Sequence, residues 1–320
     1  MCRQAPLFSE VLSKEKQKAV RRKLSRQARQ EERTAYLCLI PAFIGLIVLT
    51  YVPLVAVFII SFFEWKGIAS PHFNGIANYV RLFTTDPYFK DSIQVTAIFS
   101  VLAVLGSLVY SLIVALLLNR DIPARGFFRA VFYLPYVLPA AAVYIGWSWL
   151  YETNFGLFNY ILGLFGIDNI MFLSDSSYVV PSLAVIAVWL SGNLIVIFLA
   201  GLQNVPRVYH EAAEIDGANA WQRFVHVTLP CMTPIIFYNL LMSLITNMQV
   251  VTPALALTSG GPGNSSMFIT YLMYRYAFKS NQIGYACAIS FVFFVLIAIF
   301  TAILFSTSKR WVYYEGSDAA

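Results

Sequence analysis

Hydrophobic residues of this chain gather in six long runs separated by shorter polar segments. Each run has about 20 residues or more, which is the length that an α-helix needs to cross a bilayer. A further apolar segment, residues 156–167, is too short to cross. The six predicted spans are residues 35–63, 93–118, 130–150, 179–202, 229–257 and 285–306.

The composition supports this membrane interpretation. Hydrophobic residues make up 59% of the chain and charged residues 12%, and the mean hydropathy is +0.68. Soluble domains average about 25% charged residues, so a chain this apolar has too few polar side chains to cover a surface in water. The pattern predicts an all-α polytopic membrane protein with about six transmembrane helices.

The basic residues divide unequally between the two sides of the predicted membrane domain. Of the 22 Lys and Arg residues, 17 lie in residues 1–34, the second and fourth loops and the C-terminal tail, and the alternate loops hold five. The positive-inside rule therefore places both termini in the cytosol. Three parts follow: a basic cytosolic arm at 1–34, the six-span domain at 35–306 and a cytosolic tail at 307–320.

The ten basic residues of the arm favour contact with anionic lipid of the bilayer. Nucleic-acid binding is not expected, because no aromatic residue lies among the basic residues between Lys14 and Arg33.

Several kinds of chemistry are missing from the sequence. All charges fall in loops or at span edges, whereas ion and proton paths usually need a charge inside the bilayer. An ion-coupled secondary transporter of a neutral solute is therefore kept only as an alternative interpretation of this membrane protein. No lysine follows a glycine, so no nucleotide-binding P-loop exists. The run His210–Glu214 has a glutamate where a zinc-binding helix needs its second histidine, so no metal site is predicted.

A polar segment, residues 206–230, separates the fourth and fifth runs on the predicted cytosolic side. It includes "HEAAEIDGANAWQRFVHVTLP". Glu211 and Glu214 are expected to begin a helix, where acids suit the positive end of the helix dipole. Gly217 should end or bend this helix, and Trp221 begins a second amphipathic piece. The pattern predicts a helix–turn–helix along the membrane surface, suited to docking a partner; an ordinary solvated loop is the alternative.

The order of residues in this segment resembles the EAA signature of ABC importer permeases. Three other stretches, "FNGIANYVRLF", "FRAVFYLPYVLPAAAVYIGWSWLYETNFGLFN" and "LTSGGPGNSSMFITYLMYRYAF", resemble the maltose-type carbohydrate-uptake branch of that family. The resemblance extends from about residue 35 to the C-terminus and leaves out the basic arm. The matching EAA residues are Glu211, Ala212, Ala213, Asp216, Gly217, Ala218, Leu229 and Pro230.

The resemblance implies a subunit of an importer in the prokaryotic cytoplasmic (inner) membrane. Its partners would be a second permease, expected to be a different but homologous chain, two cytosolic ATPase subunits and an extracytoplasmic sugar-binding protein. ATP and Mg²⁺ would bind to the ATPases, so this chain is expected to hold no cofactor and no catalytic residue. Glu211 would pair with a basic residue of the ATPase, the alanines would permit close approach, and Gly217 would make the turn.

Polar residues of the fourth and fifth runs are candidates for contact with a sugar or oligosaccharide. Amides and hydroxyls match sugar hydroxyls, and aromatic rings offer flat apolar faces. Ser243, Thr246, Asn247 and Val250 recur at helical spacing, so they are expected to share one face. Small polar residues also join membrane helices to each other, which is the alternative role. The resemblance places the sugar site here, and the candidates are Trp189, Ser191, Asn193, Ser243, Thr246 and Asn247.

Two tryptophans of the third run, Trp147 and Trp149, are expected to anchor the protein at the membrane–water interface instead.

Overall fold

The computed structural model describes residues 26–68 and 70–313. Most of the predicted basic arm and residues 314–320 of the predicted tail lie outside these described residues. The chain divides into two compact units, Met1–Ala56 and Val57–Ala320. Helices dominate both, as the all-α prediction requires, and the exception within the described residues is a two-stranded hairpin.

The first predicted span is a long helix that includes a wide turn. Helix α2 (Arg26–Leu46) continues through the π-helical turn η1 (Ile47–Tyr51) into α3 (Val52–Ile60). The wide turn ends two residues before Pro53, which has no N–H to donate to the preceding turn. The apolar side chains of this helix are exposed, with Leu49 at 76%. Lipid is a suitable solvent for such a surface because all its backbone bonds are made internally.

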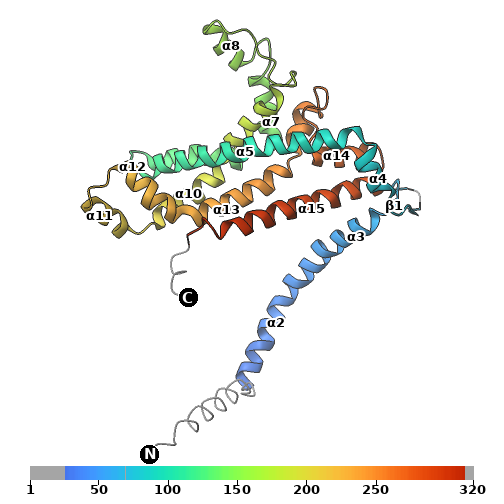
Figure 1. Ribbon diagram of the computed structural model, residues 1–320, viewed down its shortest axis with the longest axis horizontal. Coiled ribbons are helices and arrows are strands. Elements are labelled where there is room, and N and C mark those ends of the chain that lie inside the picture. The colour runs from blue at the N-terminus through green and yellow to red at the C-terminus, as the bar shows by residue number, and fades with distance from the viewer. Residues whose placement is uncertain (1–25, 69, 314–320) are drawn as a thin grey trace, which may run out of the picture. The chain divides into compact units, whose positions relative to one another are not determined.

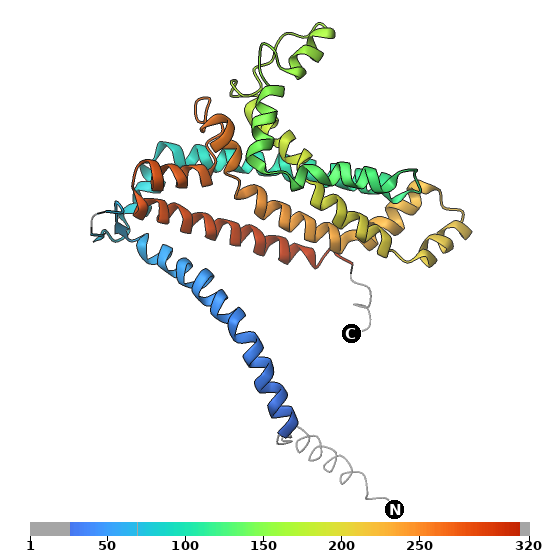
Figure 2. The ribbon, with the colours of Figure 1, turned by 180° about the vertical axis from the view of Figure 1, so that it is seen from behind.

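The second unit is built around α5 (Pro87–Asn119), a helix of 33 residues. Helices α9 (Val179–Trp189), α10 (Gly192–Asn204) and α13 (Leu229–Met248) pack against it. Figure 1 and Figure 2 show that α13 runs between α5 and α15 (Ile283–Ser308). Several small hydroxyl side chains of α5 are buried; they are Ser92, Thr96, Ser100, Ser107 and Ser111.

Two of the six predicted spans are bent pairs of helices rather than single helices. In the third run, α6 (Arg125–Val137) and α7 (Ala140–Leu150) meet at 99°, and α9 and α10 of the fourth run meet at 48°. Leu138 is extended between α6 and α7 because the following residue is Pro139. Among the described residues, four unbroken helices are long and apolar enough to cross a membrane, and the bent pairs raise the number to six.

The fifth span also differs from its predicted bounds. It begins earlier, because α12 (Ala220–Arg223), the wide turn η2 (Phe224–Thr228) and α13 form one helix, Ala220–Met248. It ends at Met248 rather than at residue 257, since Pro253 has no N–H to donate to Gln249 and continue the helix. Val250 is therefore not on the helical face predicted for it.

Shorter elements close the two ends of the second unit (Figure 1). At one end lie β1 (Phe63–Glu64), β2 (His72–Phe73), α4 (Ala77–Thr84), α14 (Ile269–Tyr274) and the wide turn η4 (Arg275–Lys279). At the other end lie α11 (Arg207–Ile215) and α12. These are called the α4 end and the α12 end below. The remaining elements are α8 (Leu157–Leu164), too short to cross as its sequence predicts, and η3 (Ala254–Thr258).

Candidate functional site

The polar segment at the α12 end folds as the predicted helix–turn–helix, with α11 and α12 as its two helices. Gly217 has φ +77°, a left-handed conformation that residues with a Cβ rarely adopt. The N–H of Ala218 donates to the oxygen of Ala213 at 2.9 Å, and the N–H of Gly217 donates to that of Glu214 at 3.0 Å. This pair of bonds is a Schellman motif, which ends α11 and satisfies its last carbonyls.

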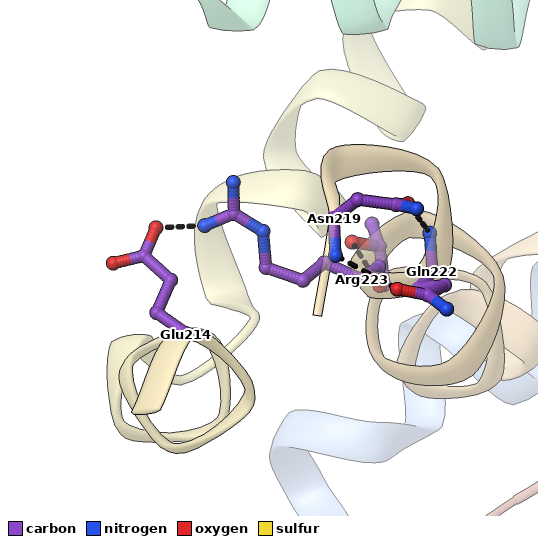
Figure 3. Close-up of polar contacts among 5 residues, drawn as sticks. Glu214, Asn219, Gln222 and Arg223 are labelled. Carbon is purple, nitrogen blue, oxygen red and sulfur yellow. Dashed lines mark hydrogen bonds and ion pairs between the residues drawn. The ribbon is translucent and has the colours of Figure 1, made fainter. Parts of the chain in front are cut away.

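The second helix of this pair begins with a reciprocal cap. The N–H of Gln222 donates to Asn219 Oδ1 at 2.9 Å, and the N–H of Asn219 donates to Gln222 Oε1 at 2.8 Å. Such a capping box satisfies two backbone donors that the first turn leaves free. An ion pair between Glu214 and Arg223 then joins the two helices (Figure 3). The turn geometry is therefore determined from both sides by contacts within 17 residues.

The position of the acids in α11 differs from the sequence expectation. The helix begins at Arg207, so Glu211 lies in its middle and Glu214 in its last turn, and the first turn holds no acid. The helix dipole therefore does not stabilise these carboxylates as expected. Pro206 precedes the helix and starts it earlier than the acids indicated.

Large apolar side chains of the helix pair face solvent. Ile215 is 88% exposed and Trp221 is 71% exposed. Two such side chains beside a glycine turn form a surface suited to a protein partner. Because α12 continues without a break into α13, this surface belongs to the same helix as a candidate membrane span.

The candidate sugar residues lie at two places where membrane helices break. Trp189 is the last residue of α9, Ser191 is the residue directly before α10, and Asn193 is in the first turn of α10. Thr246 and Asn247 lie in the last turn of α13, before the chain leaves the helix at Gln249. Helix ends expose carbonyls that have no intrahelical partner. Non-helical backbone within a membrane domain is typical of places that line a cavity or are buried in protein.

Several candidates already have partners inside the chain. Ser191 Oγ lies 2.9 Å from Ser111 Oγ of α5 and donates to Val188 O at 2.6 Å. Asn247 Nδ2 donates to Ser243 O at 2.8 Å and to Ser243 Oγ at 3.1 Å. Within the described residues, no hydrogen bond joins the fourth-run candidates to those of the fifth run. Ser191 therefore attaches the helix break to α5, while Thr246 and Trp189 remain exposed.

The two tryptophans of the third run differ in their exposure. Trp147 is 9% exposed, and its ring packs against Trp189 with ring centroids 5.6 Å apart. Its expected role as an interface anchor is wrong, because the 99° bend after α6 points α7 into contact with α9. Trp149 is 74% exposed, as an anchor would be.

Comparison with known protein families shows to which family this chain belongs. Residues 107–313 match the model of the binding-protein-dependent transport system inner membrane component. This match covers more than half of the chain and includes the helix pair and both helix breaks. The chain belongs to this family of ABC importer permeases. It is thus a multi-pass inner membrane protein, and the family favours an ATP-driven importer over the ion-coupled alternative.

The relatives of this permease support its assignment to the family. The probable ABC transporter permease protein YesP of Bacillus subtilis (strain 168) is 35% identical over 92% of this chain and 97% of its own length. The multiple sugar-binding transport system permease protein MsmF of Streptococcus mutans is 34% identical over 83% of this chain and 91% of its own. A bacterial ABC transporter that imports the acidic polysaccharide alginate shares the fold, with a TM-score of 0.77 at 22% identity, over 90% of this chain and 100% of that one.

One residue that contacts the helix break between α9 and α10 was not predicted from the sequence of the permease. Ser111, which pairs with Ser191, lies in the middle of an apolar run. A signal was present, since the hydroxyl residues of α5 recur at intervals of four and seven, the spacing of one helical face. What the sequence does not show is which helix that face meets.

Proposed function

We propose that this chain forms half of the translocation pathway of an importer that takes up a sugar or oligosaccharide delivered by an extracytoplasmic binding protein. A second permease, a different homologous chain, forms the other half, and two cytosolic ATPase subunits supply the energy. The observation that carries this proposal is the unbroken helix Ala220–Met248, which joins the helix pair to a membrane span in a chain of this family. The sugar-transport name of the streptococcal relative supports the substrate class.

In this proposal the helix pair α11–α12 docks in the ATPase and carries its movement to α13. Glu211 pairs with a basic residue of the ATPase, and Gly217 holds the turn in its left-handed conformation. Ala212, Ala213, Asp216 and Ala218 keep the docking surface small, and Leu229 and Pro230 lie where the helix enters the span. ATP and Mg²⁺ bind to the ATPase, and this permease contributes no catalytic residue.

Both termini lie in the cytosol in this proposal. Two observations support it: 17 of the 22 basic residues fall on that side, and the end of α15 lies beside the start of α13. The latter contact is the bond from the Tyr313 N–H to Thr233 Oγ1 at 2.9 Å. A reporter fused after residue 320 should be active only in its cytosolic form, and an active external reporter would refute this topology.

The transported sugar contacts side chains at the two helix breaks. Hydroxyl, amide and indole groups there match a neutral saccharide, and the predicted spans hold no charge to compete for the ligand. The residues proposed are Trp189, Ser191, Asn193, Ser243, Thr246 and Asn247.

Copurification tests the importer as a whole. The chain expressed with proteins encoded beside it should elute with an ATPase and a second permease, and the complex should hydrolyse ATP faster when binding protein and sugar are added. Stable purification of this chain without an ATPase, with uptake driven by an ion gradient, would refute the proposal.

A pair of variants tests the sugar residues. Asn247→Ala removes an amide from the proposed site, and each lost hydrogen bond should weaken sugar binding by about 1–3 kcal/mol at normal complex yield. Thr96→Val is the matched control, because it breaks a buried contact between α5 and α14 that includes none of the proposed sugar residues, and it should lower the yield without changing sugar preference. Unchanged uptake by Asn247→Ala on a panel of saccharides would remove Asn247 from the site.

A further inference from the structure

A polar cavity of about 420 Å³ opens at the α4 end of the second unit, and its lining residues include none of the proposed sugar residues. Three separate segments form it: the hairpin after α3, helix α4 and the start of α15. Its charged and polar wall includes Glu64, Lys66, Asn74, Arg81 and Gln282, together with the indole of Trp65.

One guanidinium in this wall is held in place from two sides. Arg81 Nη1 donates to Gln282 Oε1 at 2.9 Å, and the Arg81 guanidinium carbon lies 4.1 Å from the centre of the Tyr285 ring. Such stacking leaves the edge of the guanidinium, with its remaining N–H groups, free to donate. Among the described residues, no carboxylate lies within ion-pair distance of Arg81.

The acid bonded to this tyrosine, Asp86, already accepts hydrogen bonds from other donors. Asp86 Oδ2 accepts from the hydroxyls of Tyr276 at 2.8 Å and Tyr285 at 2.6 Å. Asp86 Oδ1 accepts from the backbone N–H groups of Tyr88 and Phe89. Burial, and then the hydrogen bond to Asp86, raise the pKa of Tyr276, so its phenol stays a donor. Asp86 therefore fixes the platform under Arg81 and leaves the guanidinium without a carboxylate.

Hydrogen bonds join the segments that form the cavity wall. Asn78 Nδ2 donates to Ser61 O at 2.9 Å and to Phe63 O at 3.0 Å, and the Gly284 N–H donates to Trp65 O at 3.2 Å. A Cβ at position 284 would clash with Phe63 O, so the hairpin and α15 touch backbone to backbone. The cavity is therefore formed before any ligand arrives, which lowers the entropic cost of binding.

The chemistry that fits this cavity is a carboxylate. A fixed guanidinium edge matches the two oxygens of a carboxylate with parallel hydrogen bonds. Glu64 is paired with Lys66 at 3.7 Å, and both side chains are largely exposed, so this pair contributes little and leaves Arg81 available. A neutral saccharide would offer the guanidinium no opposite charge.

The position of the cavity indicates which molecule carries the carboxylate. It lies at the opposite end of α5 and α15 from the helix pair (Figure 1). This step rests on the proposed function: if α11–α12 faces the cytosolic ATPase, the cavity faces the binding protein outside. We infer that Arg81 forms an ion pair with an acidic side chain of the extracytoplasmic binding protein and so positions that protein on the permease.

The salt and charge dependence of docking tests this inference. The complete importer in lipid nanodiscs would be titrated with its purified, sugar-loaded binding protein, with ATP hydrolysis as the readout. In the wild type, the half-stimulating concentration should rise as salt is increased, because the contact is ionic. Arg81→Gln should raise this concentration about tenfold, weaken its salt dependence and leave the maximal rate unchanged. Arg81→Lys, which keeps the charge but loses the planar edge, should fall between the two.

Controls separate the possible failures. Lys90→Gln removes another basic residue near the same end, outside the cavity wall, and should change the half-stimulating concentration less than twofold. A wild-type concentration independent of salt, or an Arg81→Gln complex titrating like the wild type at normal yield, would overturn the inference and leave the proposed function standing. If Arg81→Gln changes only the uptake of acidic saccharides, the carboxylate comes from the substrate and the inference is overturned. No stimulation of the wild type by any binding protein would instead contradict the proposed function.

Discussion

The helix pair at the α12 end and the Arg81 cluster at the α4 end, which consists of Arg81, Asp86, Tyr276, Gln282 and Tyr285, are built in opposite ways. Capping partners Asn219 and Gln222 are three residues apart, and the ion pair Glu214–Arg223 spans nine. In the cluster, Asp86 meets Tyr285 across 199 residues, and Arg81 meets Gln282 across 201. The first region is encoded in one short segment, whereas the second exists only after α4 and the cap of α5 have met the start of α15.

This difference predicts different consequences of mutation. The helix pair is exposed to solvent, so its individual contacts add little to the stability of the permease, but its shape determines what it can dock against. The Arg81 cluster includes buried phenols and a helix cap, so its loss should destabilise the second unit. Changes at the α12 end should thus affect transport before stability, and changes at Asp86 should do the reverse.

The largest effect is expected at Gly217. Gly217→Val places a β-branched residue at φ +77°, which costs ~1–3 kcal/mol and should open the turn between α11 and α12. Uptake should be lost, measured with labelled sugar in vesicles, while the ATPase still hydrolyses ATP. No atom lies within 4 Å of a Cβ at this position, so the effect comes from backbone conformation alone. Gly217→Asn is the control, since asparagine tolerates this conformation and should keep much of the uptake.

The next effect is a loss of stability at the α4 end. Asp86→Ala removes the cap of α5 and the acceptor of two phenols, and should lower the free energy of unfolding by about 2–4 kcal/mol. The thermal denaturation midpoint of the purified complex measures it. Asp91→Ala, an exposed acid on the same helix, should shift the midpoint little. Equal midpoints for the two variants would show that the cluster does not stabilise this end.

A smaller effect is expected from the cap of α12. Asn219→Ala removes one half of the capping box and should destabilise the start of the helix by about 1 kcal/mol. Faster hydrogen exchange at the backbone amide of Gln222 would report it. Gln222→Ala removes only the reciprocal bond and should have a smaller effect. Loss of complex stability in Asn219→Ala would contradict the view that this region affects docking rather than folding.

The smallest effect is expected at the ion pair. The side chain of Glu214 is 61% exposed and that of Arg223 is 27% exposed, so their coupling should be about 0–1 kcal/mol. A double-mutant cycle with Glu214→Gln and Arg223→Gln, measured by denaturation of the complex, isolates this energy. A coupling well above this range would place the pair among the main determinants of the turn.

Much of the fold and of the helix pair could be predicted because the signals are local. The six apolar runs follow from the length needed to cross a bilayer, and all six appear as helices or bent pairs. The turn at Gly217 follows from the missing Cβ of one residue, and the family from an ordered motif of about twenty residues. The family assignment and the membrane class were both confirmed; the roles of the candidate sugar residues stay predictions.

Only the tertiary structure decided where the helices break and which polar groups meet. Pro41, Pro135 and Pro234 lie inside helices, whereas Pro139 follows a 99° bend and Pro253 follows the end of α13. Neighbouring helices, wide turns and polar side chains can satisfy the carbonyl that a proline frees, so the outcome depends on packing and not on the proline alone. The same holds for Ser111 with Ser191 and for Arg81 with Tyr285: the sequence determined which residues could bond, and packing between distant segments determined which ones did.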